Sequence, residues 1–384
     1  MTCCRGKKII FLIFGLILML SSNVVACNIY CSDCTSCITA INSVSSGQTI
    51  CLNTSIFSNE TCINNPANFN NKIFDCRVKA ISGNGSDYGI YLKGKYNNTI
   101  KNCIISNFNE GIYLSSSVEF IGGSYVEVPS SNNLITSNFL MFNNGDGIFI
   151  KDSSNNIISD NYIYQSSCNV GCGGISLWWS TDNYIINNNI TSNTNGIYLK
   201  ESSNNFIYNN FFDNWHNIAF EGNASHINYW NTTKKQGKNI IDGSYLGGNF
   251  WSGFSNNLTS CNPNNGFCQN IFSISTNNID KLPLTMLCLS NNSCLSTEAC
   301  NMTTHTCQNL NCPENETLFN HTCVKCNLFD FDNNTEVDIF DVVIALEYIS
   351  KGEIQIANLC TTPEGKIDLM DVLRLIEKIG LCSI

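Results

Sequence analysis

The chain has 384 residues, of which only 13% are charged, and it carries 23 cysteines and a formal net charge of -10. Soluble proteins average about 25% charged residues, and this acidic chain lacks the Lys/Arg surplus that nucleic acids attract, so we expect no nucleic-acid partner. With 43% hydrophobic residues, its composition is that of a folded rather than a disordered chain. So many cysteines rarely stay reduced in the cytosol, and they indicate an oxidising compartment.

Residues 1–26 are predicted to be a secretory signal peptide. Three basic residues precede an apolar run that ends at Leu20, and this run is too short to span a bilayer comfortably. Two alternatives remain at this end, an uncleaved anchor helix and a lipid attached to Cys27 in a sequence that loosely resembles a bacterial lipobox. In each case we expect an exported protein, secreted or held at the cell surface.

The middle of the chain repeats a short motif, Gly-Ile-aromatic-Leu-Lys. Its copies begin at Gly89, Gly111, Gly147, Gly174, Gly196 and, in decayed form, Asn217. The steps between copies are 22, 36, 27, 22 and 21 residues, which gives a unit of about 22 with insertions of about 14 and 5. An Asn-rich motif, Asn-Asn-x-Ile-x-x-Asn-x-Ile, follows the first motif in each unit.

A period near 22 residues, with two short alternating strands per unit, is typical of a solenoid. Strand alternation places Ile90 and Leu92 on one face and Tyr91 and Lys93 on the other. Asn residues at the same turn of successive coils can stack as an amide ladder. Leucine-rich repeats share the period, but they require a Leu-rich spacing and a helical return that this chain lacks.

The repeats therefore predict a mainly β chain with a right-handed parallel β-helix over residues 27–285. Its cap is expected over residues 27–52, with an amphipathic helix over residues 36–46 and the first rung at 47–52. A small disulfide-rich segment and a small α-helical domain are expected to follow.

Over roughly residues 36–285 these motifs resemble the NosD-type, or carbohydrate-binding-and-sugar-hydrolase, β-helix family within the pectin-lyase-like folds. The closing segments 239–243, 247–251 and 278–284 are the most distinctive part of the resemblance. It implies a protein that binds or processes polysaccharide. The NosD relatives in nitrous-oxide reductase maturation also suggest copper handling, which the scarcity of His makes the least favoured function.

The outward positions of the first motif hold the candidate carbohydrate-binding residues. They are Tyr91, Lys93, Tyr113, Phe149, Lys151, Trp178, Tyr198 and Lys200. Neighbouring strands lie about 4.8 Å apart, close to the length of one sugar unit, and aromatic rings stack on sugar C–H faces while Lys pairs with uronates or sulfates. We therefore expect a monomeric solenoid that binds glycan. The alternative is that the outward ladder only stabilises the solenoid.

No pair of carboxylates stands at these outward positions, although hydrolases require one. The catalytic residues are therefore unknown, and a divergent polysaccharide lyase or glycoside hydrolase is the alternative function. Three acidic residues that lie close together in sequence, Asp146, Asp152 and Asp160, are assigned to turns. His216 and His226 are assigned structural or solvated roles.

The cysteines fall mostly at the cap and the insertions. Cys168 and Cys172 bracket the shorter insertion, and Cys261 and Cys268 bracket a later segment, so both pairs are disulfide candidates. Cys31, Cys34 and Cys37 have CxxC spacings that also occur in zinc sites. Because no His lies nearby and the chain is expected to be exported, disulfides are favoured over zinc. Residues 286–326 are expected to form a cysteine-rich linker module.

Oxygen-bearing side chains near the C-terminus follow the spacing of a calcium loop. The expected ligands are Asp330, Asp332, Asn334, Glu336, Asp338 and Asp341. A weaker second Ca²⁺ site is expected at Glu364, Asp368 and Asp371, where Cys360 and Thr362 occupy the first ligand positions.

Two half-EF loops, each followed by a helix, resemble a dockerin module over residues 327–384. The resemblance implies docking onto a cohesin-type protein. The alternative is an acidic helical hairpin that binds no ion.

Overall fold

The computed structural model describes residues 26–168, 171–222, 226–264 and 266–288, with short segments between 291 and 324. The described residues divide into two compact units. The first holds residues up to 262 together with 267–285, and the second holds 263–266 and the segments from 286 onward. The expected calcium loops lie outside the described residues. None of the described helices is long and apolar enough to cross a membrane.

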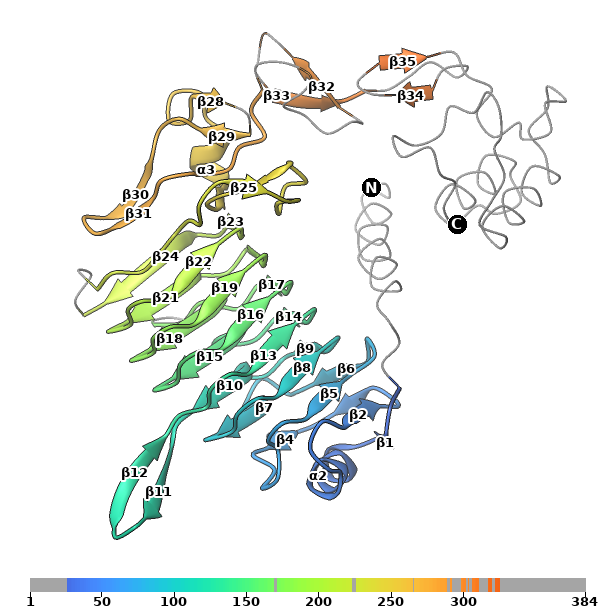
Figure 1. Ribbon diagram of the computed structural model, residues 1–384. Coiled ribbons are helices and arrows are strands. Elements are labelled where there is room, and N and C mark those ends of the chain that lie inside the picture. Colours follow the sequence, from blue (N-terminus) through green and yellow to red (C-terminus); the bar gives the residue numbers. More distant parts are fainter. Residues whose placement is uncertain are drawn as a thin grey trace, which may run out of the picture. The chain divides into compact units, whose positions relative to one another are not determined.

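The first unit is a parallel β-helix of three sheets, each of which receives one strand from most turns of the chain (Figure 1). Sheet A runs β1 (Ile29–Cys31), β2 (Thr49–Leu52), β5 (Ile73–Asp75), β8 (Thr99–Lys101), β13 (Leu134–Thr136), β16 (Ile157–Ser159), β19 (Tyr184–Ile186) and β22 (Phe206–Tyr208). Sheet B runs β3 (Ile56–Phe57), β6 (Ala80–Ser82), β9 (Ile104–Ser106), β14 (Phe139–Met141), β17 (Tyr162–Tyr164), β20 (Asn189–Thr191), β23 (Phe211–Asp213) and β27 (Phe250–Trp251). Sheet C runs β4 (Ile63–Asn64), β7 (Tyr88–Lys93), β10 (Glu110–Ser115), β15 (Ile148–Lys151), β18 (Ile175–Trp178), β21 (Asn195–Lys200) and β24 (His216–Glu221).

The expectation of two strands per unit is corrected to three. The first motif forms sheet C, but the Asn-rich motif divides between sheets A and B. The turn at Ser137 and Asn138 separates β13 from β14, and Ser137 adopts a left-handed conformation with φ 57°. A strand cannot continue through such a residue, so the chain turns a second corner in each coil.

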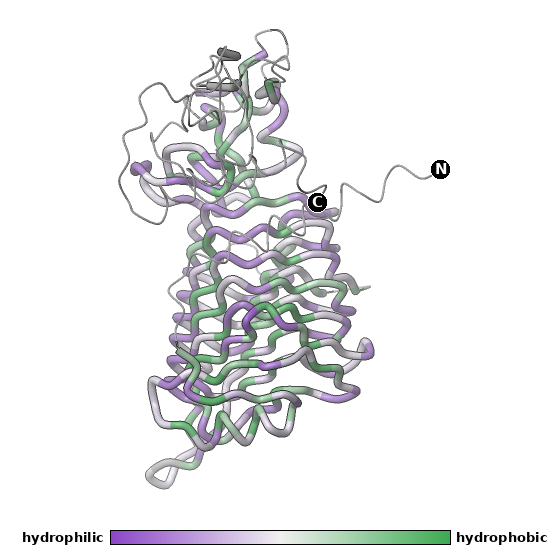
Figure 2. Tube along the Cα trace, turned by 90° about the vertical axis from the view of Figure 1, so that its right-hand side faces the viewer, coloured by the Kyte–Doolittle hydropathy of each residue, from purple (hydrophilic) through white to green (hydrophobic). Residues whose placement is uncertain are grey.

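Stacked aliphatic side chains fill the interior, as the alternating pattern predicted. Ile90, Ile112, Ile148, Ile175 and Ile197 lie in register along sheet C and are all fully buried. Burying one such side chain stabilises the fold by about 1.5–3 kcal/mol. Hydropathy along the chain shows the same alternation through successive coils (Figure 2).

The predicted amide ladders are confirmed at two turns. One ladder runs through Asn98, Asn133, Asn156, Asn183, Asn205, Asn228 and Asn278, and the other through Asn138, Asn161, Asn188, Asn210 and Asn249. In both, the backbone N–H of each residue donates to the Oδ1 of the next at 2.9–3.1 Å. These bonds satisfy buried turn amides that no sheet reaches.

The cap differs in detail from the prediction. Helix α2 spans Cys34–Ser43 and begins with a capping box between Asp33 and Ser36. The first rung of sheet A is β1, which pairs with β2, so the helix lies between two rungs rather than before them. The Nζ atom of Lys72 donates to the carbonyls of Ile41 and Asn68 at 2.7 and 2.6 Å, and this ties the end of α2 to the next coil.

Seven disulfides occur among the described residues. They are Cys27–Cys51, Cys31–Cys37, Cys34–Cys62, Cys76–Cys103, Cys168–Cys172, Cys261–Cys268 and Cys288–Cys300. The cysteines do not lie only at the cap and the insertions, because Cys76 and Cys103 are part of the hydrophobic core of the coils. Cys27 uses its Sγ in a disulfide, which leaves no thiol there for a thioether lipid.

The two insertions project from the coils. The longer one is an antiparallel hairpin of β11 (Ser117–Ile121) and β12 (Ser124–Val128), which extends away from the sheets (Figure 1). The shorter one ends in the loop closed by Cys168–Cys172.

The closing segment ends both ladders, because Asn249 and Asn278 are their last residues. The Oδ2 of the buried Asp280 accepts from the backbone N–H of Asn249 at 2.7 Å and from the Trp251 indole at 3.0 Å. The remaining elements are β25 (Lys235–Gln236), β26 (Tyr245–Leu246), α3 (Ser252–Ser255), β28 (Pro263–Asn264), β29 (Phe267–Cys268), β30 (Phe272–Ser275) and β31 (Asn278–Asp280). The second unit contains the hairpins of β32 (Glu298–Asn301) with β33 (Thr306–Asn309) and β34 (Thr317–Phe319) with β35 (Thr322–Val324).

Candidate functional site

The outward positions of sheet C stack in the predicted register. One row reads Tyr91, Tyr113, Phe149, Ser176, Tyr198 and Ala219, and the next reads Lys93, Ser115, Lys151, Trp178, Lys200 and Glu221. All eight candidate residues therefore lie on one face of one sheet. Parallel pairing without a bulge accounts for this, since each motif copy enters sheet C at the same residue.

The rings of this face contact one another. Tyr91 lies 5.1 Å from Tyr113, which stacks on Phe149 with centroids 4.7 Å apart and planes 14° apart. Trp178 places its ring edge-on to Phe149 at 5.1 Å. Contacts of this kind contribute about 0.5–1.5 kcal/mol each beyond the area they bury. These ring contacts on the outer face of sheet C therefore stabilise the solenoid, independently of any ligand binding.

Two of the eight candidates cannot offer an open ring to a ligand. Phe149 is only 9% exposed because Tyr113 and Trp178 cover it. Tyr198 is 7% exposed, and a Cβ atom at Gly171, in the disulfide-closed loop, would lie 3.5 Å from its hydroxyl. Sequence spacing could not reveal this, because covering residues come from insertions and neighbouring coils.

An ionic cluster closes the end of the aromatic row. The Tyr198 hydroxyl donates to the Glu221 carboxylate, and the Nζ of Lys200 lies 2.6 Å from that carboxylate. Hydrogen bonds from Lys200 and Tyr198 lower the pKa of Glu221, while burial first and then Glu221 raise the pKa of Tyr198. Burial also raises the pKa of Tyr113. Both phenols therefore stay protonated and remain hydrogen-bond donors.

Trp179 is an exposed aromatic that sequence reasoning missed. It follows β18 directly, is 45% exposed and adopts a left-handed conformation with φ 49°. The ammonium groups of Lys200 and Lys151 lie 5.3 and 5.7 Å from its ring centroid. The same turn is left-handed in the neighbouring coils, at Asp152 with φ 48° and at Glu201 with φ 46°, so the geometry of the coil accounts for this conformation. The sequence signal was the doubled tryptophan at 178–179, of which only the first fitted the motif.

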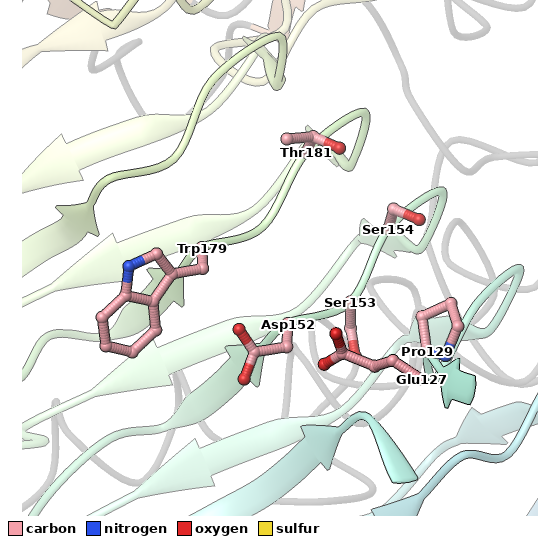
Figure 3. A pocket seen from close by; sticks show the side chains of 7 residues that line it. All are labelled: Glu127, Pro129, Asp152, Ser153, Ser154, Trp179 and Thr181. Atoms are coloured by element: carbon pink, nitrogen blue, oxygen red, sulfur yellow. The ribbon is translucent and has the colours of Figure 1, made fainter. Parts of the chain in front are cut away.

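Beside Trp179 lies an open pocket of about 250 Å³ (Figure 3). Its lining residues are Glu127, Pro129, Asp152, Ser153, Ser154, Trp179 and Thr181. They come from the end of the β11–β12 hairpin and from the turns that follow β15 and β18. The pocket therefore exists only where the long insertion returns to the coil.

Two carboxylates meet in this pocket, although none pair at the outward strand positions. Burial first, and then the negative charge of Glu127, raise the pKa of Asp152, while Lys151 opposes the shift. The Ser116 hydroxyl donates to Glu127. The outward strand positions of sheet C hold no carboxylate pair, as predicted, and this pair lies instead at the hairpin and the turn after β15. Glu127 was missed because it belongs to an insertion that aligns with no repeat.

The other acidic candidates have structural roles. Asp146 is buried and accepts hydrogen bonds from the Gly173 backbone at 2.7 Å and from the Ser176 hydroxyl. Burial raises its pKa to about 8. Asp160 lies at a left-handed turn with φ 58° and accepts from Asn187, as the turn assignment predicted.

Copper ligands do not assemble among the described residues. Every cysteine between residues 27 and 288 is in a disulfide, and no three His, Cys, Asp or Glu side chains cluster within the described ranges. Copper prefers clustered thiolate, thioether or imidazole ligands. The described His, Cys, Asp and Glu side chains thus form no cluster of this kind.

The fold defines a disulfide-rich parallel β-helix protein, and disulfides in this number are typical of proteins outside reducing compartments. The chain belongs to the NosD family, described as "Periplasmic copper-binding protein (NosD)", which matches residues 20–256. No sequence among the curated proteins matches it.

Several solved structures resemble the chain at low identity. A variant of the periplasmic alginate epimerase AlgG has 18% identity and a TM-score of 0.28 over 43% of this chain and 35% of that one. An alginate lyase from Paenibacillus sp. str. FPU-7 has 12% identity and a TM-score of 0.31 over 47% of this chain and 75% of the lyase. The Agl-KA catalytic domain has 15% identity and a TM-score of 0.33 over 55% of this chain and 46% of that domain. The alignment thus spans less than half of the epimerase and of the Agl-KA domain.

Proposed function

We propose that this protein binds polysaccharide outside the cytoplasm, along the outer face of sheet C. The observation that carries the proposal is the exposed Trp179, which extends an in-register row of aromatic and Lys side chains beside a pocket. Sugar rings stack on exposed aromatic faces, and Trp179, at 45% exposed, is more accessible than any predicted aromatic residue of this face.

The accessible members of the face are the exposed Lys93 and Trp179 and the partly exposed Tyr91, Tyr113, Lys151, Trp178 and Lys200. Strands about 4.8 Å apart repeat at nearly the length of a sugar unit. A glycan chain that crosses the strands would therefore meet an equivalent position on each coil. Phe149 and Tyr198 support the face from beneath rather than contact the ligand.

A glycan array tests this function. We expect binding by the full chain that is lost in a Tyr91→Ala, Tyr113→Ala, Trp179→Ala triple variant. Tyr184→Ala is the matched control, because Tyr184 stacks on Phe206 at 4.7 Å on sheet A, away from this face. Unchanged binding by the triple variant would show that the face has only a stabilising role.

We further propose that residues 327–384 tether the protein to a cohesin-type partner through calcium. This proposal depends on ligand spacing alone, with Asp330, Asp338 and Asp341 as the central ligands of the first loop. Calcium calorimetry of the full chain should show a site that an Asp330→Ala, Asp338→Ala variant loses. Capture by an immobilised cohesin should require calcium. If this variant binds calcium with the same heat as the unaltered protein, the proposal is wrong.

A second candidate function is hydrolysis or lyase chemistry on the bound glycan. The meeting of Glu127 and Asp152 favours it, since glycosidases use two carboxyl groups. The raised pKa of Asp152 suits a proton donor. Reducing-sugar and unsaturated-uronate assays should then detect products that Glu127→Gln and Asp152→Asn abolish.

A further inference from the structure

We propose that the pocket between the β11–β12 hairpin and Trp179 binds one unit of a neutral, hydroxyl-rich glycan and disfavours uronates. This inference rests on the proposed function, because it assigns the sugar class to part of the same surface. The lysines of this face, Lys93, Lys151 and Lys200, would by themselves favour acidic sugars, so the inference is the opposite of what their charge predicts.

The charges that line the pocket are negative. Glu127 and Asp152 both face it, and no Lys or Arg is among its lining residues. Ionised carboxylates only accept hydrogen bonds, and sugar hydroxyls can donate to them. A uronate would bring a third carboxylate beside these two, and like charges placed together at an interface oppose binding.

The rest of the lining suits a sugar ring. Ser154 and Thr181 add hydroxyl groups, and Trp179 supplies the aromatic wall opposite the hairpin (Figure 3). The volume of about 250 Å³ lies just below the range of about 300–1,000 Å³ that encloses drug-sized ligands. It therefore fits one unit of a longer chain rather than a whole oligosaccharide.

The hairpin continues this surface beyond the pocket. Cross-strand pairing joins Val118 with Glu127 and Phe120 with Tyr125, so these four side chains share one face of the ribbon. Tyr125 is 80% exposed and Phe120 66%, and their rings meet edge-on at 5.2 Å. A glycan held in the pocket by Glu127 would meet these rings next.

The hairpin can be removed without disturbing the coil. In the coil after the hairpin, a single left-handed residue, Asp152, joins Lys151 to Ser153. One coil earlier, Ser115 pairs with Lys151 and the backbone N–H of Ser130 donates to Ser153, so Ser115 and Ser130 hold the equivalent positions. Residues 116–129 can therefore be replaced by a single Gly. This coil would then match its neighbour, where Gly94 adopts φ 62°.

The experiment compares neutral hexasaccharides of β-1,4-linked glucose, mannose and galactose with their C6-oxidised uronate forms, by calorimetry on the full chain. The glucosamine hexasaccharide provides a cationic probe. We expect at least one neutral form to bind about tenfold more tightly than its uronate form. Trp179→Ala and the hairpin replacement should each weaken that binding by about tenfold.

The double variant Glu127→Gln, Asp152→Asn tests the cause of the selectivity. Asn suits the left-handed position of Asp152, so the turn is preserved. This variant should bring neutral and uronate affinities within about threefold of each other. Raised salt should narrow the same gap in the unaltered protein, because it screens the repulsion.

Three results would overturn the inference. They are tighter binding of the uronate form, binding of the cationic probe alone, and neutral binding that Trp179→Ala and the hairpin replacement leave unchanged. If binding depends on Tyr91 and Tyr113 but not on the pocket variants, the proposed function stands and only this inference fails. If no oligosaccharide binds at all, both fail. Thermal melting of each variant, with Tyr184→Ala as control, separates lost binding from lost folding.

Discussion

The uninterrupted coils and the coil that carries the hairpin differ in what they leave exposed. In coils 22 residues long, the inner side chains stack on their neighbours and the turn amides bond along Asn ladders. The hairpin brings Glu127 back beside Asp152 and opens the pocket. Regular repetition thus provides stability, because the ladder residues and the inner aliphatic side chains each meet an equivalent residue one coil away. The insertion that interrupts this repetition forms a pocket, because it places Glu127 beside Asp152 and Trp179, which are not its equivalents in the repeat.

The largest expected effect of a single substitution lies within the regular coils. Asn161→Ala removes the Oδ1 that accepts from the backbone N–H and the Nδ2 of Asn138, both at 3.0 Å. It also removes the bond from Asn161 to the Ile135 carbonyl at 2.9 Å. Each buried group left unpaired costs about 1–3 kcal/mol. We expect a loss of about 3–5 kcal/mol in denaturant unfolding.

The control for this change is Asn155→Gly, at an exposed left-handed turn residue of the same coil. Glycine tolerates that conformation, so the loss should stay below about 1 kcal/mol. Equal losses at Asn155 and Asn161 would contradict a role for the ladder.

The disulfides allow the same comparison with a smaller effect. Cys76–Cys103 joins neighbouring coils with a sequence separation of 27, whereas Cys168–Cys172 closes an inserted loop with a separation of 4. Chain-entropy arguments predict about 3–4 kcal/mol for the longer loop and about 2 kcal/mol for the shorter. Paired Cys→Ala variants, compared by denaturant unfolding, should show this order. A larger loss from the short loop would contradict it.

Stability should also depend on pH through Asp146. Burial raises the pKa of its carboxyl to about 8 in the folded protein, against the ordinary 3.8 of an aspartate. Between these values the folded state holds a proton that the unfolded state has released. Because of that proton, the free energy of unfolding falls as the pH rises from about 4 to about 8, by at most about 1.4 kcal/mol per pH unit.

Asp146→Asn should reduce this slope and leave the part that comes from Asp280, since burial raises the pKa of that carboxyl to about 7. Asp160→Asn at the exposed turn should leave the slope unchanged. Urea unfolding at several pH values measures both variants. A slope that Asp146→Asn leaves at its full value would contradict the role of Asp146.

The smallest expected effect comes from the hairpin itself. Residues 124–127 are exposed, and the ribbon projects from the coils (Figure 1). Replacing residues 116–129 with one Gly should therefore change stability by less than about 1 kcal/mol while it removes the pocket. Thermal unfolding of this variant measures whether the pocket can be removed without loss of stability. A large loss would show that the hairpin supports the coil.

Sequence reasoning recovered the features that depend on repetition. It placed Tyr91, Tyr113 and Phe149 in one row and located both insertions correctly. It also anticipated the Asn138 ladder and paired Cys168 with Cys172. It missed the division of each coil into three strands, because a left-handed turn at a residue such as Ser137 leaves little trace in the hydrophobic pattern.

The sequence by itself determined the coil, its period and its inner face, because each repeat meets a copy of itself and the physics of one unit holds for all. Only the tertiary structure decided which outer side chains reach solvent. Burial of Phe149 and Tyr198 depends on neighbouring rings and a loop. The meeting of Glu127, Asp152 and Trp179 depends on where an unrepeated hairpin returns. Such contacts join residues with no common period, so no repeat pattern encodes them.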